Sequence, residues 1–318
     1  MDSAAVRSTA FFIGDVALDD YYTAERWPEL ADKAPFDATG SYVGGMIANA
    51  ASVHAGLGGP TEFISLLNDG PLSQRLCADL GNHGLGTTHM LYDPEVPDSR
   101  NMIFLVGGEH VVLYAETGDS PMMLPPTAME ALNAPGFLYT TLSRAKRLRA
   151  GTSTGDAVLA QLRGHGRRVV FDLDVEGFVA GDEGYLHGAE VIIMNQIGFQ
   201  LSFGEPDPAA VAAWMRKHEV GTVIRTLAAA GAEIHDGTGV QTVPGYTVPV
   251  VDVTGAGDTF GGALVFALSE STGLRPAVEF AVAAASRAVT IEGPRGGVAA
   301  REDVEEFRRA RTASEART

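Results

Sequence analysis

The chain alternates short apolar runs with longer stretches in which apolar residues recur at helical spacing. The runs typical of strands are Phe11–Gly14, Glu62–Leu66, Met102–Val106, His110–Tyr114, Phe137–Thr140, Val169–Asp172, Val191–Met194 and Thr222–Arg225. The stretches typical of helices are Met46–Ala55, Leu72–Leu80, Thr154–Arg163, Pro208–His218, Asp258–Ser269 and Ala277–Glu292. Such alternation indicates βαβ units. It predicts a three-layer α/β/α fold with a doubly wound, mostly parallel sheet, which binds ligands at the carboxyl ends of its strands.

Composition narrows the range of partners. The 318 residues include 23 basic and 40 acidic side chains, for a net charge of −17. This balance argues against general binding to nucleic acid or to an anionic membrane surface. No apolar run reaches the roughly 18 residues that span a bilayer. The single cysteine, Cys77, excludes an internal disulfide, and we expect a cytoplasmic protein.

One segment departs from the alternation. The runs Met102–Val106 and His110–Tyr114 flank Gly107-Gly108-Glu109, a spacing that predicts a β-hairpin. A hairpin inside an α/β chain indicates a small additional sheet. That sheet is either an addition to the edge of the main one or a lid over a binding site.

The most informative segment, at 250–264, reads VVDVTGAGDTFGGAL. An apolar strand end passes into a turn of small residues and then into a helix. The backbone amides of Gly255, Ala256 and Gly257 are little shielded, and the helix dipole adds positive charge there, so the turn suits an anion. A carboxylate at this turn would repel a bound phosphate, so holding phosphate does not explain the presence of Asp258. Asp258 is instead a candidate base for the proton of an attacking hydroxyl. The alternative is an ordinary strand-to-helix turn that Asp258 caps.

Other nucleotide-binding turns fit this segment poorly. A dinucleotide-binding turn would have glycine at the position of Phe260 and would lie in a βαβ unit that carries an acidic residue about 20 positions further on, but this segment lies late in the chain, without that βαβ partner. A Walker A loop requires Gly-Lys-Ser/Thr, which is missing here. The segment is therefore interpreted as an anion hole beside a base.

Three motifs together resemble the ribokinase-like (PfkB-type) carbohydrate kinases. The segment DVTGAGD at 252–258 is similar to the family's carboxy-terminal signature, whose usual form is D-T-x-G-A-G-D. The segment GGMIANAA at 44–51, followed by LGG at 57–59, resembles the family's other signature. The segment GDVALD at 14–19 resembles the first strand, which ends in a sugar-binding aspartate. The order and spacing of these motifs extend the resemblance over about residues 10 to 305.

The resemblance implies a role for each residue that matches a motif. Asp258 matches the general base, and the backbone amides of Gly255, Ala256 and Gly257 match the anion hole. Asp19, Gly45 and Asn49 match the residues for the acceptor sugar, and Asn195, Thr226 and Gly231 match those for the nucleotide. Asp252, with backbone carbonyls of Glu292–Val298, matches the site of a monovalent cation. The cofactors that the resemblance implies are ATP and Mg²⁺, with K⁺ as the monovalent cation.

Two positions depart from the family's pattern near the expected phosphates. Gly198 stands where the N-x-x-E motif that begins at Asn195 has glutamate. Ala228 replaces a glycine of the nucleotide loop. We interpret these changes as marks of a divergent subfamily, and they leave weak activity or another phosphoryl donor open.

A basic cluster at 144–149 follows the strand Phe137–Thr140, whose carboxyl end is expected to face the site. A guanidinium can bind a carboxylate, phosphate or sulfonate through two parallel hydrogen bonds. Arg144 is therefore a candidate contact for an anionic acceptor such as a sugar acid. The alternative is a solvated basic surface.

The preferred interpretation is an ATP-dependent kinase that phosphorylates a hydroxyl of a sugar or sugar derivative. A nucleoside kinase and a non-catalytic sugar-binding regulator on the same fold are the alternatives. We expect a single ribokinase-like domain over residues 1–318, with a β lid from about 16–43 and 98–116 and a frayed tail at 308–318. The lid is expected to cover the sugar and to join two chains in a homodimer.

Overall fold

A mostly parallel sheet forms the middle layer of the protein. The computed structural model describes residues 8–107, 109–115, 120–205 and 207–315. In the order in which they pair, the strands of this central sheet are β16 (Gly239–Pro244), β15 (Gly231–Asp236), β14 (Thr222–Thr226), β13 (Val191–Asn195), β12 (Arg167–Asp172), β10 (Gly136–Thr140), β1 (Ala10–Ile13) and β4 (Thr61–Ile64). Neighbours from β4 to β14 are parallel, whereas β14, β15 and β16 pair antiparallel. The predicted sheet is confirmed.

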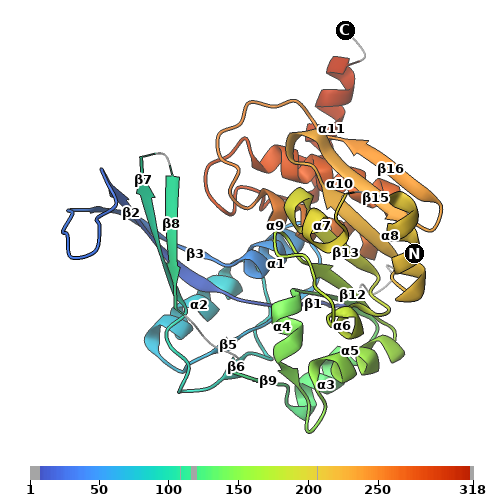
Figure 1. Ribbon diagram of the computed structural model, residues 1–318, viewed down its shortest axis with the longest axis horizontal. Coiled ribbons are helices and arrows are strands. Elements are labelled where there is room, and N and C mark those ends of the chain that lie inside the picture. Colours follow the sequence, from blue (N-terminus) through green and yellow to red (C-terminus); the bar gives the residue numbers. More distant parts are fainter. Residues whose placement is uncertain (1–7, 108, 116–119, 206, 316–318) are drawn as a thin grey trace, which may run out of the picture.

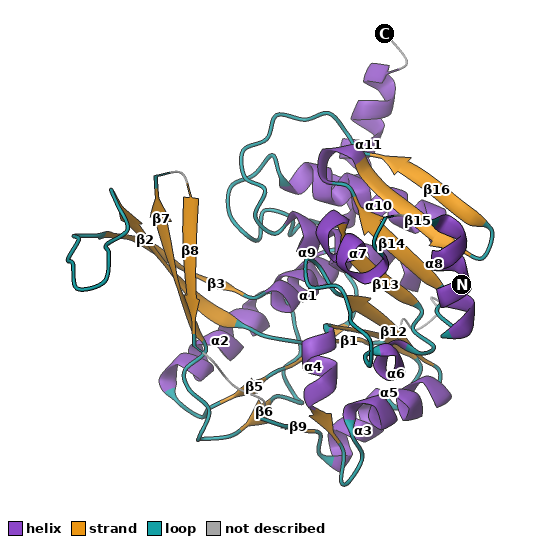
Figure 2. Cartoon of the chain, viewed as in Figure 1, coloured by secondary structure: helices purple, strands orange, loops and turns teal. Residues whose placement is uncertain are grey.

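Helices cover both faces of this sheet (Figure 1, Figure 2). One face packs against α1 (Met46–Gly56), α2 (Pro71–Asn82), α9 (Ala256–Ser269), α10 (Leu274–Ala288) and α11 (Arg301–Glu315). The other packs against α3 (Pro126–Leu132), α4 (Leu142–Arg147), α5 (Gly155–Gly164), α6 (Glu183–Leu186), α7 (Gln196–Phe203) and α8 (Pro208–Lys217). The architecture is the three-layer α/β/α arrangement that the sequence predicts.

Side chains along a core strand alternate between the two faces of the sheet. In β1, Phe12 belongs to the hydrophobic core beneath α1 and α9, whereas Phe11 and Ile13 belong to the core beneath α3 and α5. All three are buried, because a sheet covered on both faces has no solvent side. The strands therefore read as continuous apolar runs in the sequence rather than as alternating ones.

Close packing of α1 against α9 joins distant parts of the chain. A β-carbon on Gly262 would overlap the carbonyl oxygen of Ala50, so the two helices approach at a distance that only glycine permits. Their first turns meet, because Asn49 of α1 donates a hydrogen bond to Asp258 of α9. The motifs at 44–51 and 252–258 thus contribute to one site.

A second, smaller sheet stands away from the three layers (Figure 1). Its strands pair in the order β3 (Asp37–Gly44), β2 (Ala17–Ala24), β7 (Arg100–Val106) and β8 (Glu109–Tyr114). The strands β7 and β8 pair antiparallel, which confirms the predicted hairpin, although Gly108 of its turn lies outside the described residues. These strands lie in the segments expected to form the lid, except that β3 ends one residue later, at Gly44; residue 116 of those segments also lies outside the described residues.

Two sequence expectations cover Asp19, the end of the first strand and the lid segment at 16–43, and the structure agrees with the second. The first core strand ends at Ile13, and Asp19 lies further along the chain, in β2 of the small sheet. The chain leaves the central sheet after Ile13 and enters the small sheet at Ala17, where β2 pairs with both β3 and β7. Asp19 therefore reaches the site from the lid and not from the edge of the central sheet.

The segment expected to be a frayed tail, from Arg308, is helical over its described length. It continues α11 as far as Glu315, and residues 316–318 lie outside the described residues. The helix is held to the core because Val304 is buried and Phe307 packs edge-on against Tyr246, with ring centres 5.3 Å apart.

Short elements complete the described chain. They are the strand pair β5 (Leu66–Leu67) with β6 (Leu91–Tyr92), the pair β9 (Met122–Met123) with β11 (Leu148–Arg149), and the 3₁₀ turn η1 (Ala228–Ala230). Across the described ranges, every helix is too short or too polar to cross a bilayer.

Candidate active site

The turn before α9 is fixed by its backbone. Gly255 has φ +75°, in the left-handed region that favours glycine. A β-carbon there would overlap the carbonyl oxygen of Pro294, so the turn lies directly against the loop that follows α10. The amide of Ala256 is used within the turn, on the carbonyl of Val253 at 3.2 Å. The amide of Gly257 lies in the first helical turn, where amides have no intrahelical partner, and Gly257 is exposed at the surface.

Asp258 occupies the same helical turn, with its carboxylate partly buried. Nδ2 of Asn49 donates a hydrogen bond to Oδ2 of Asp258 at 2.8 Å. Burial raises the pKa of Asp258 to about 8; the Asn49 bond opposes this shift, and the carboxylates of Asp172 and Asp174 add to it. A carboxylate that titrates this close to neutral pH suits a general base.

A buried pair lies next to Asp258. Asp172, at the end of β12, accepts a 2.5 Å hydrogen bond from the hydroxyl of Tyr139 in β10. Burial raises the pKa of Asp172 to about 6, a shift that the Tyr139 bond opposes and Asp174 reinforces. Burial and the same carboxylates raise the pKa of Tyr139 far above its usual value, so the hydroxyl remains a donor. The surroundings of Asp258 are thus negative, which favours its protonated form.

Asp19 approaches from the lid and is held by polar neighbours. Its Oδ1 accepts a 2.7 Å hydrogen bond from Nδ2 of Asn101, and a β-carbon on Gly44 would overlap its Oδ2. Burial raises the pKa of Asp19; the Asn101 bond and the charge of Arg295 lower it, while Asp20 raises it. Asp19 is therefore a carboxylate already oriented by one amide, with lone pairs left for a ligand.

Gly45 connects the lid to the helix that carries Asn49. It has φ +111°, and a β-carbon would overlap the carbonyl oxygen of Asp15. The position therefore requires glycine for conformation and for space. Of the expected acceptor residues, the structure places Gly45 and Asn49 at the start of α1 beside Asp258, and Asp19 on the lid.

Arg144 lies between two pockets. It forms an ion pair with Asp15, in the loop after β1. Both residues line a pocket of about 210 Å³ that also contains Asp172 and Asp174. Arg144 also lines a pocket of about 580 Å³, in which the basic neighbours are Lys146, Arg147 and Arg149. The basic cluster is thus part of a hollow next to the carboxylates, and its first guanidinium already has a carboxylate partner.

Asn195 is committed to the local fold. Its Oδ1 accepts from the amides of Ile197 at 2.9 Å and Gly198 at 3.0 Å, so it caps α7. Its Nδ2 donates to Asp174 at 2.9 Å. The residue lies at the carboxyl end of β13, where the sequence expects a nucleotide contact, but its structural role accounts for its presence by itself.

The expected nucleotide loop lies between β14 and β15. Thr226 ends β14, and Gly231 begins β15 with φ +97°. Ala228, between them, has φ +49°, a left-handed conformation that is unfavourable for a residue with a β-carbon. The replacement of the usual glycine therefore keeps the loop shape at the cost of local strain.

Asp252 joins two loops. Its Oδ1 accepts from the amide of Thr254 at 2.8 Å, and its Oδ2 accepts from the amide of Gly293 at 2.9 Å. Desolvation acts to raise the pKa of Asp252, but the hydrogen bonds from Thr254 and Gly293 together hold it below its usual value. The carboxylate thus ties the turn before α9 to the loop after α10, where the expected carbonyl ligands of a cation lie.

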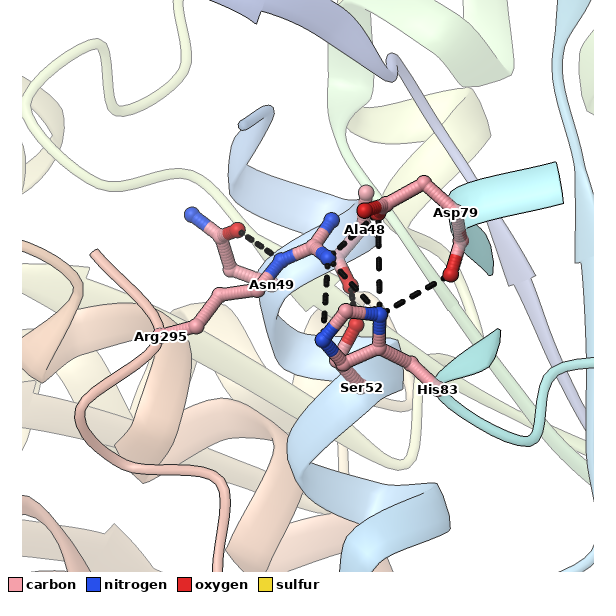
Figure 3. Close-up of polar contacts among 6 residues, drawn as sticks. All are labelled: Ala48, Asn49, Ser52, Asp79, His83 and Arg295. Carbon is pink, nitrogen blue, oxygen red and sulfur yellow. Dashed lines mark hydrogen bonds and ion pairs between the residues drawn. The ribbon is translucent and has the colours of Figure 1, made fainter. Parts of the chain in front are cut away.

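Sequence reasoning missed Arg295. This residue lies in the loop from which only backbone carbonyls were expected, yet its side chain reaches Asn49 (Figure 3). Nothing in the local pattern signals this contact, because the partners lie 246 positions apart. The only available hint is an arginine between Pro294 and Gly296, in a loop that meets the carboxy-terminal motif.

The amino-acid sequence matches a known family. The family model described as pfkB family carbohydrate kinase matches residues 9–300. The chain belongs to this family. Membership supports sugar kinase activity in general and confirms the resemblance found in the motifs.

Curated relatives of this pfkB-family chain include ribokinases. The ribokinase of Haemophilus influenzae is 27% identical over 283 residues, which cover 83% of this chain and 86% of the relative. The ribokinase of Bacillus subtilis is 24% identical over 306 residues, covering 93% and 97%. The aminoimidazole riboside kinase of Salmonella typhimurium is 27% identical over 270 residues, covering 79% and 82%.

Solved structures confirm the fold. The ribokinase of Arabidopsis thaliana, complexed with ribose and ATP, matches with a TM-score of 0.80 and 21% identity, over 95% of this chain and 99% of the other. The ribokinase of Thermotoga maritima matches with a TM-score of 0.79 and 21% identity, over the same shares. The ribokinase-like fold with a small separate sheet is therefore established.

The raised pKa of Asp258 predicts a pH-dependent cost to stability. An unfolded aspartate titrates near pH 4, whereas Asp258 in the fold titrates near 8. Between these values the folded chain retains a proton that the unfolded chain has released, so stability falls as pH rises. The variant Asp258→Asn cannot ionise, so its stability relative to wild type should increase from about pH 5 to about pH 9.

Urea unfolding of both proteins at several pH values measures this difference. For each pH unit between the two pKa values, the free energy of unfolding of wild type falls by about 1.4 kcal/mol relative to the variant. The partial exposure of the carboxylate reduces this amount. The exposed Glu95→Gln serves as control and should show no such trend. A constant difference between Asp258→Asn and wild type across this range would refute the raised pKa.

Proposed function

We propose that this chain transfers the γ-phosphoryl group of ATP to a hydroxyl of a sugar or sugar derivative. The observation that supports this most directly is the first turn of α9. There a carboxylate with a pKa of about 8, Asp258, stands in the same turn as the exposed backbone of Gly257. A base for the hydroxyl and backbone donors for the developing charge are what such a transfer requires.

In this mechanism Asp258 accepts the proton of the acceptor hydroxyl as that oxygen attacks the γ-phosphorus. The bond from Asn49 keeps the carboxylate oriented, and the second N–H of the Asn49 amide remains available for the acceptor. The proton stays on Asp258 because its pKa is raised, and it leaves to solvent after the product departs. The first-turn backbone of α9 stabilises negative charge on the transferred group. Closure of the lid would exclude water.

The nucleotide is proposed to lie over the carboxyl ends of β13 and β14, beside Asn195, Thr226 and Gly231. In the ranges that the structure describes, no group of three or more histidine, cysteine, aspartate or glutamate residues is arranged to hold a metal ion. Mg²⁺ would therefore be held chiefly through the phosphates, with most of its water ligands retained. Bound there, it supplies charge neutralisation to the transferred group. Gly198, in place of glutamate, fits this phosphate-centred arrangement.

The acceptor is proposed to lie between the lid and the start of α1, in contact with Asp19, Gly45 and Asn49. Carboxylate and amide groups bind sugar hydroxyls well, because together they accept and donate. Similarity to the aminoimidazole riboside kinase of Salmonella typhimurium keeps a nucleoside as a second candidate acceptor. A non-catalytic sugar-binding role is the remaining alternative, supported by the strain at Ala228 and by Gly198.

The lid is also proposed to join two copies of the chain. Phe104 stacks on Tyr22 with ring centres 4.9 Å apart, and Trp27 and Phe36 pack edge-on against Phe104. Trp27 and Phe36 are nevertheless 45% and 56% exposed. Strand alternation places Asp19 on the opposite face, so a second chain could cover the aromatic group without blocking the site. Sedimentation as a monomer at micromolar concentration would overturn this proposal.

Asp258→Asn should keep the fold and lower kcat by about 10²–10⁴, the usual range for loss of a general base. ATP consumption with a panel of sugars, sugar acids and nucleosides identifies the acceptor, and the best one serves for the variant. Glu95→Gln, an exposed carboxylate outside the site, should retain wild-type turnover. Near-normal turnover in Asp258→Asn would refute the assignment of Asp258 as the base. If wild type phosphorylates no acceptor of the panel, a binding role is favoured.

Activity should be higher in K⁺ than in a bulky organic cation at equal ionic strength. Asp252 and the loop after α10 meet at the turn before α9, so a bound cation there would offset the carboxylate and set the geometry of the turn. Initial rates in the two salts measure the effect. Equal rates would argue against a cation site and would leave the kinase proposal intact.

Arg144 predicts a preference for an anionic acceptor. The guanidinium lies between the two pockets, and a bound carboxylate or phosphate could share it with Asp15. Arg144→Ala should therefore lower kcat/KM for sugar acids by about tenfold or more, with little effect on neutral sugars. Arg168→Ala, at an exposed ion pair with Glu190, is the control. A neutral best acceptor, or equal loss for both kinds, would refute the preference.

A further inference from the structure

Arg295 connects the proposed base to a helix that carries no catalytic residue. It lies in the loop between α10 and α11, and its side chain is mostly buried, at 13% exposure. Its Nε donates to Oδ1 of Asn49 at 3.3 Å, and its Nη1 donates to Oδ2 of Asp79, in α2, at 2.6 Å. Figure 3 shows the guanidinium between Asn49 on one side and Asp79 with His83 on the other.

His83 holds the other side of the guanidinium. Nδ1 of His83 lies 2.9 Å from the carbonyl oxygen of Asp79, which can only accept, so the Nδ1 proton is used there. Nη1 of Arg295 is 3.1 Å and 3.4 Å from the two ring nitrogens, and these similar distances indicate that it lies across the ring. An ion pair and a ring contact therefore fix the rotamer of Arg295 before any ligand binds.

The chemistry of the amide makes this contact consequential. An asparagine side chain has an oxygen that accepts and a nitrogen that donates, at two ends of nearly equal shape. A guanidinium only donates. Because Arg295 faces one end of the Asn49 amide, that end must be Oδ1, and Nδ2 then points to the carboxylate of Asp258 at 2.8 Å. A reversed amide would place an acceptor against a carboxylate and a donor against a guanidinium.

We propose that Arg295 is a positioning residue that fixes which end of the Asn49 amide faces Asp258. Its catalytic consequence rests on the proposed kinase function, whereas the orientation itself does not. Because Arg295 is held by Asp79, this role makes α2 part of the support for the base.

Two other routes could link Arg295 to Asp258, and the test must separate them. The first is direct attraction between charges, since the charge of Arg295 reaches Asp19. The second is general support of the loop after α10. The titratable groups around Asp258 are Asp172, Asp174 and Tyr139, and those around Arg295 are Asp79, His83 and Asp19.

The experiment is a carbon-13 NMR titration of the Asp258 carboxyl group, assigned by Asp258→Asn, in a double-mutant cycle. Arg295→Met removes all donors and keeps an apolar stem. The Asn49 amide can then rotate, the bond to Asp258 weakens, and the carboxyl pKa should rise by about one unit, or tenfold in proton affinity. Asn49→Ala should give a similar shift. Arg295→Met in the Asn49→Ala background should add nothing, and Arg295→Lys, which still only donates, should stay close to wild type.

Each other outcome decides against the proposal. An unchanged pKa of Asp258 in Arg295→Met would overturn the proposal. An equal further rise of that pKa when Arg295→Met is added to Asn49→Ala would also overturn it, because such a rise indicates direct charge attraction. If Arg295→Met unfolds because Asp79 is left unpaired, the pair variant Arg295→Met with Asp79→Leu replaces both charges by apolar groups and serves in its place. Arg301→Met, which breaks a neighbouring ion pair with Glu270, should leave the titration unchanged.

Kinetics separate this inference from the proposed function. With the best acceptor of the panel, Arg295→Met should lower kcat by about tenfold and leave the KM for ATP unchanged, again with no further loss in the Asn49→Ala background. If wild type phosphorylates no acceptor, the proposed function fails, while the titration still decides the orientation. If wild type is active and the pKa shifts of Arg295→Met and Asn49→Ala simply add, the positioning role is refuted and the proposed function stands.

Discussion

The close packing of α1 against α9 is the constraint on which the site depends. The two helices can approach only because Gly262 leaves room for the carbonyl oxygen of Ala50. A side chain there would push the helices apart and lengthen the 2.8 Å contact between Asn49 and Asp258. The lid, the turn at Gly255 and the loop after α10 all attach to this pair of helices, so their placement follows from the same contact.

The electrostatics of the site follow from burying several carboxylates close together. Burial raises the pKa of Asp172 to about 6 and that of Asp258 to about 8; the charge of Asp174 adds to both shifts, and the charge of Asp172 adds to that of Asp258. Neutral donors hold them: Tyr139 donates to Asp172, and Asn49 donates to Asp258. Amide and hydroxyl groups orient the carboxylates without neutralising them, so the fraction of Asp258 that can accept a proton grows as the pH rises through about 8.

The fold was largely predictable from the sequence because its signals are local. Apolar runs and helical periodicity predicted the parallel strands of the central sheet and the longer helices on both of its faces, but not β15, β16, α11 or the shorter helices. Glycine-rich motifs predicted the turn at Gly255 and the start of α1. The side-chain network was not predictable in this way. Arg295, Asp79 and Asn49 come from three segments, and only the tertiary fold brings them together. Asp19 was placed by its motif at the end of the first strand and by the lid segment at 16–43 in the small sheet, and only the second placement agrees with the structure, because the chain leaves the central sheet before reaching it.

The two halves of the site differ in how they are built. On the proposed acceptor side, polar side chains form networks among themselves: Asn101 holds Asp19, and Arg295 holds Asn49. On the proposed nucleotide side, Asn195 is committed to a helix cap and Ala228 occupies a strained backbone position, so backbone shape matters more than side-chain contacts. Preoriented side chains discriminate between ligands, because a wrong partner leaves buried polar groups unpaired. Selectivity in this protein should therefore reside in the acceptor, and the donor half should tolerate change in sequence as long as its backbone conformation is kept.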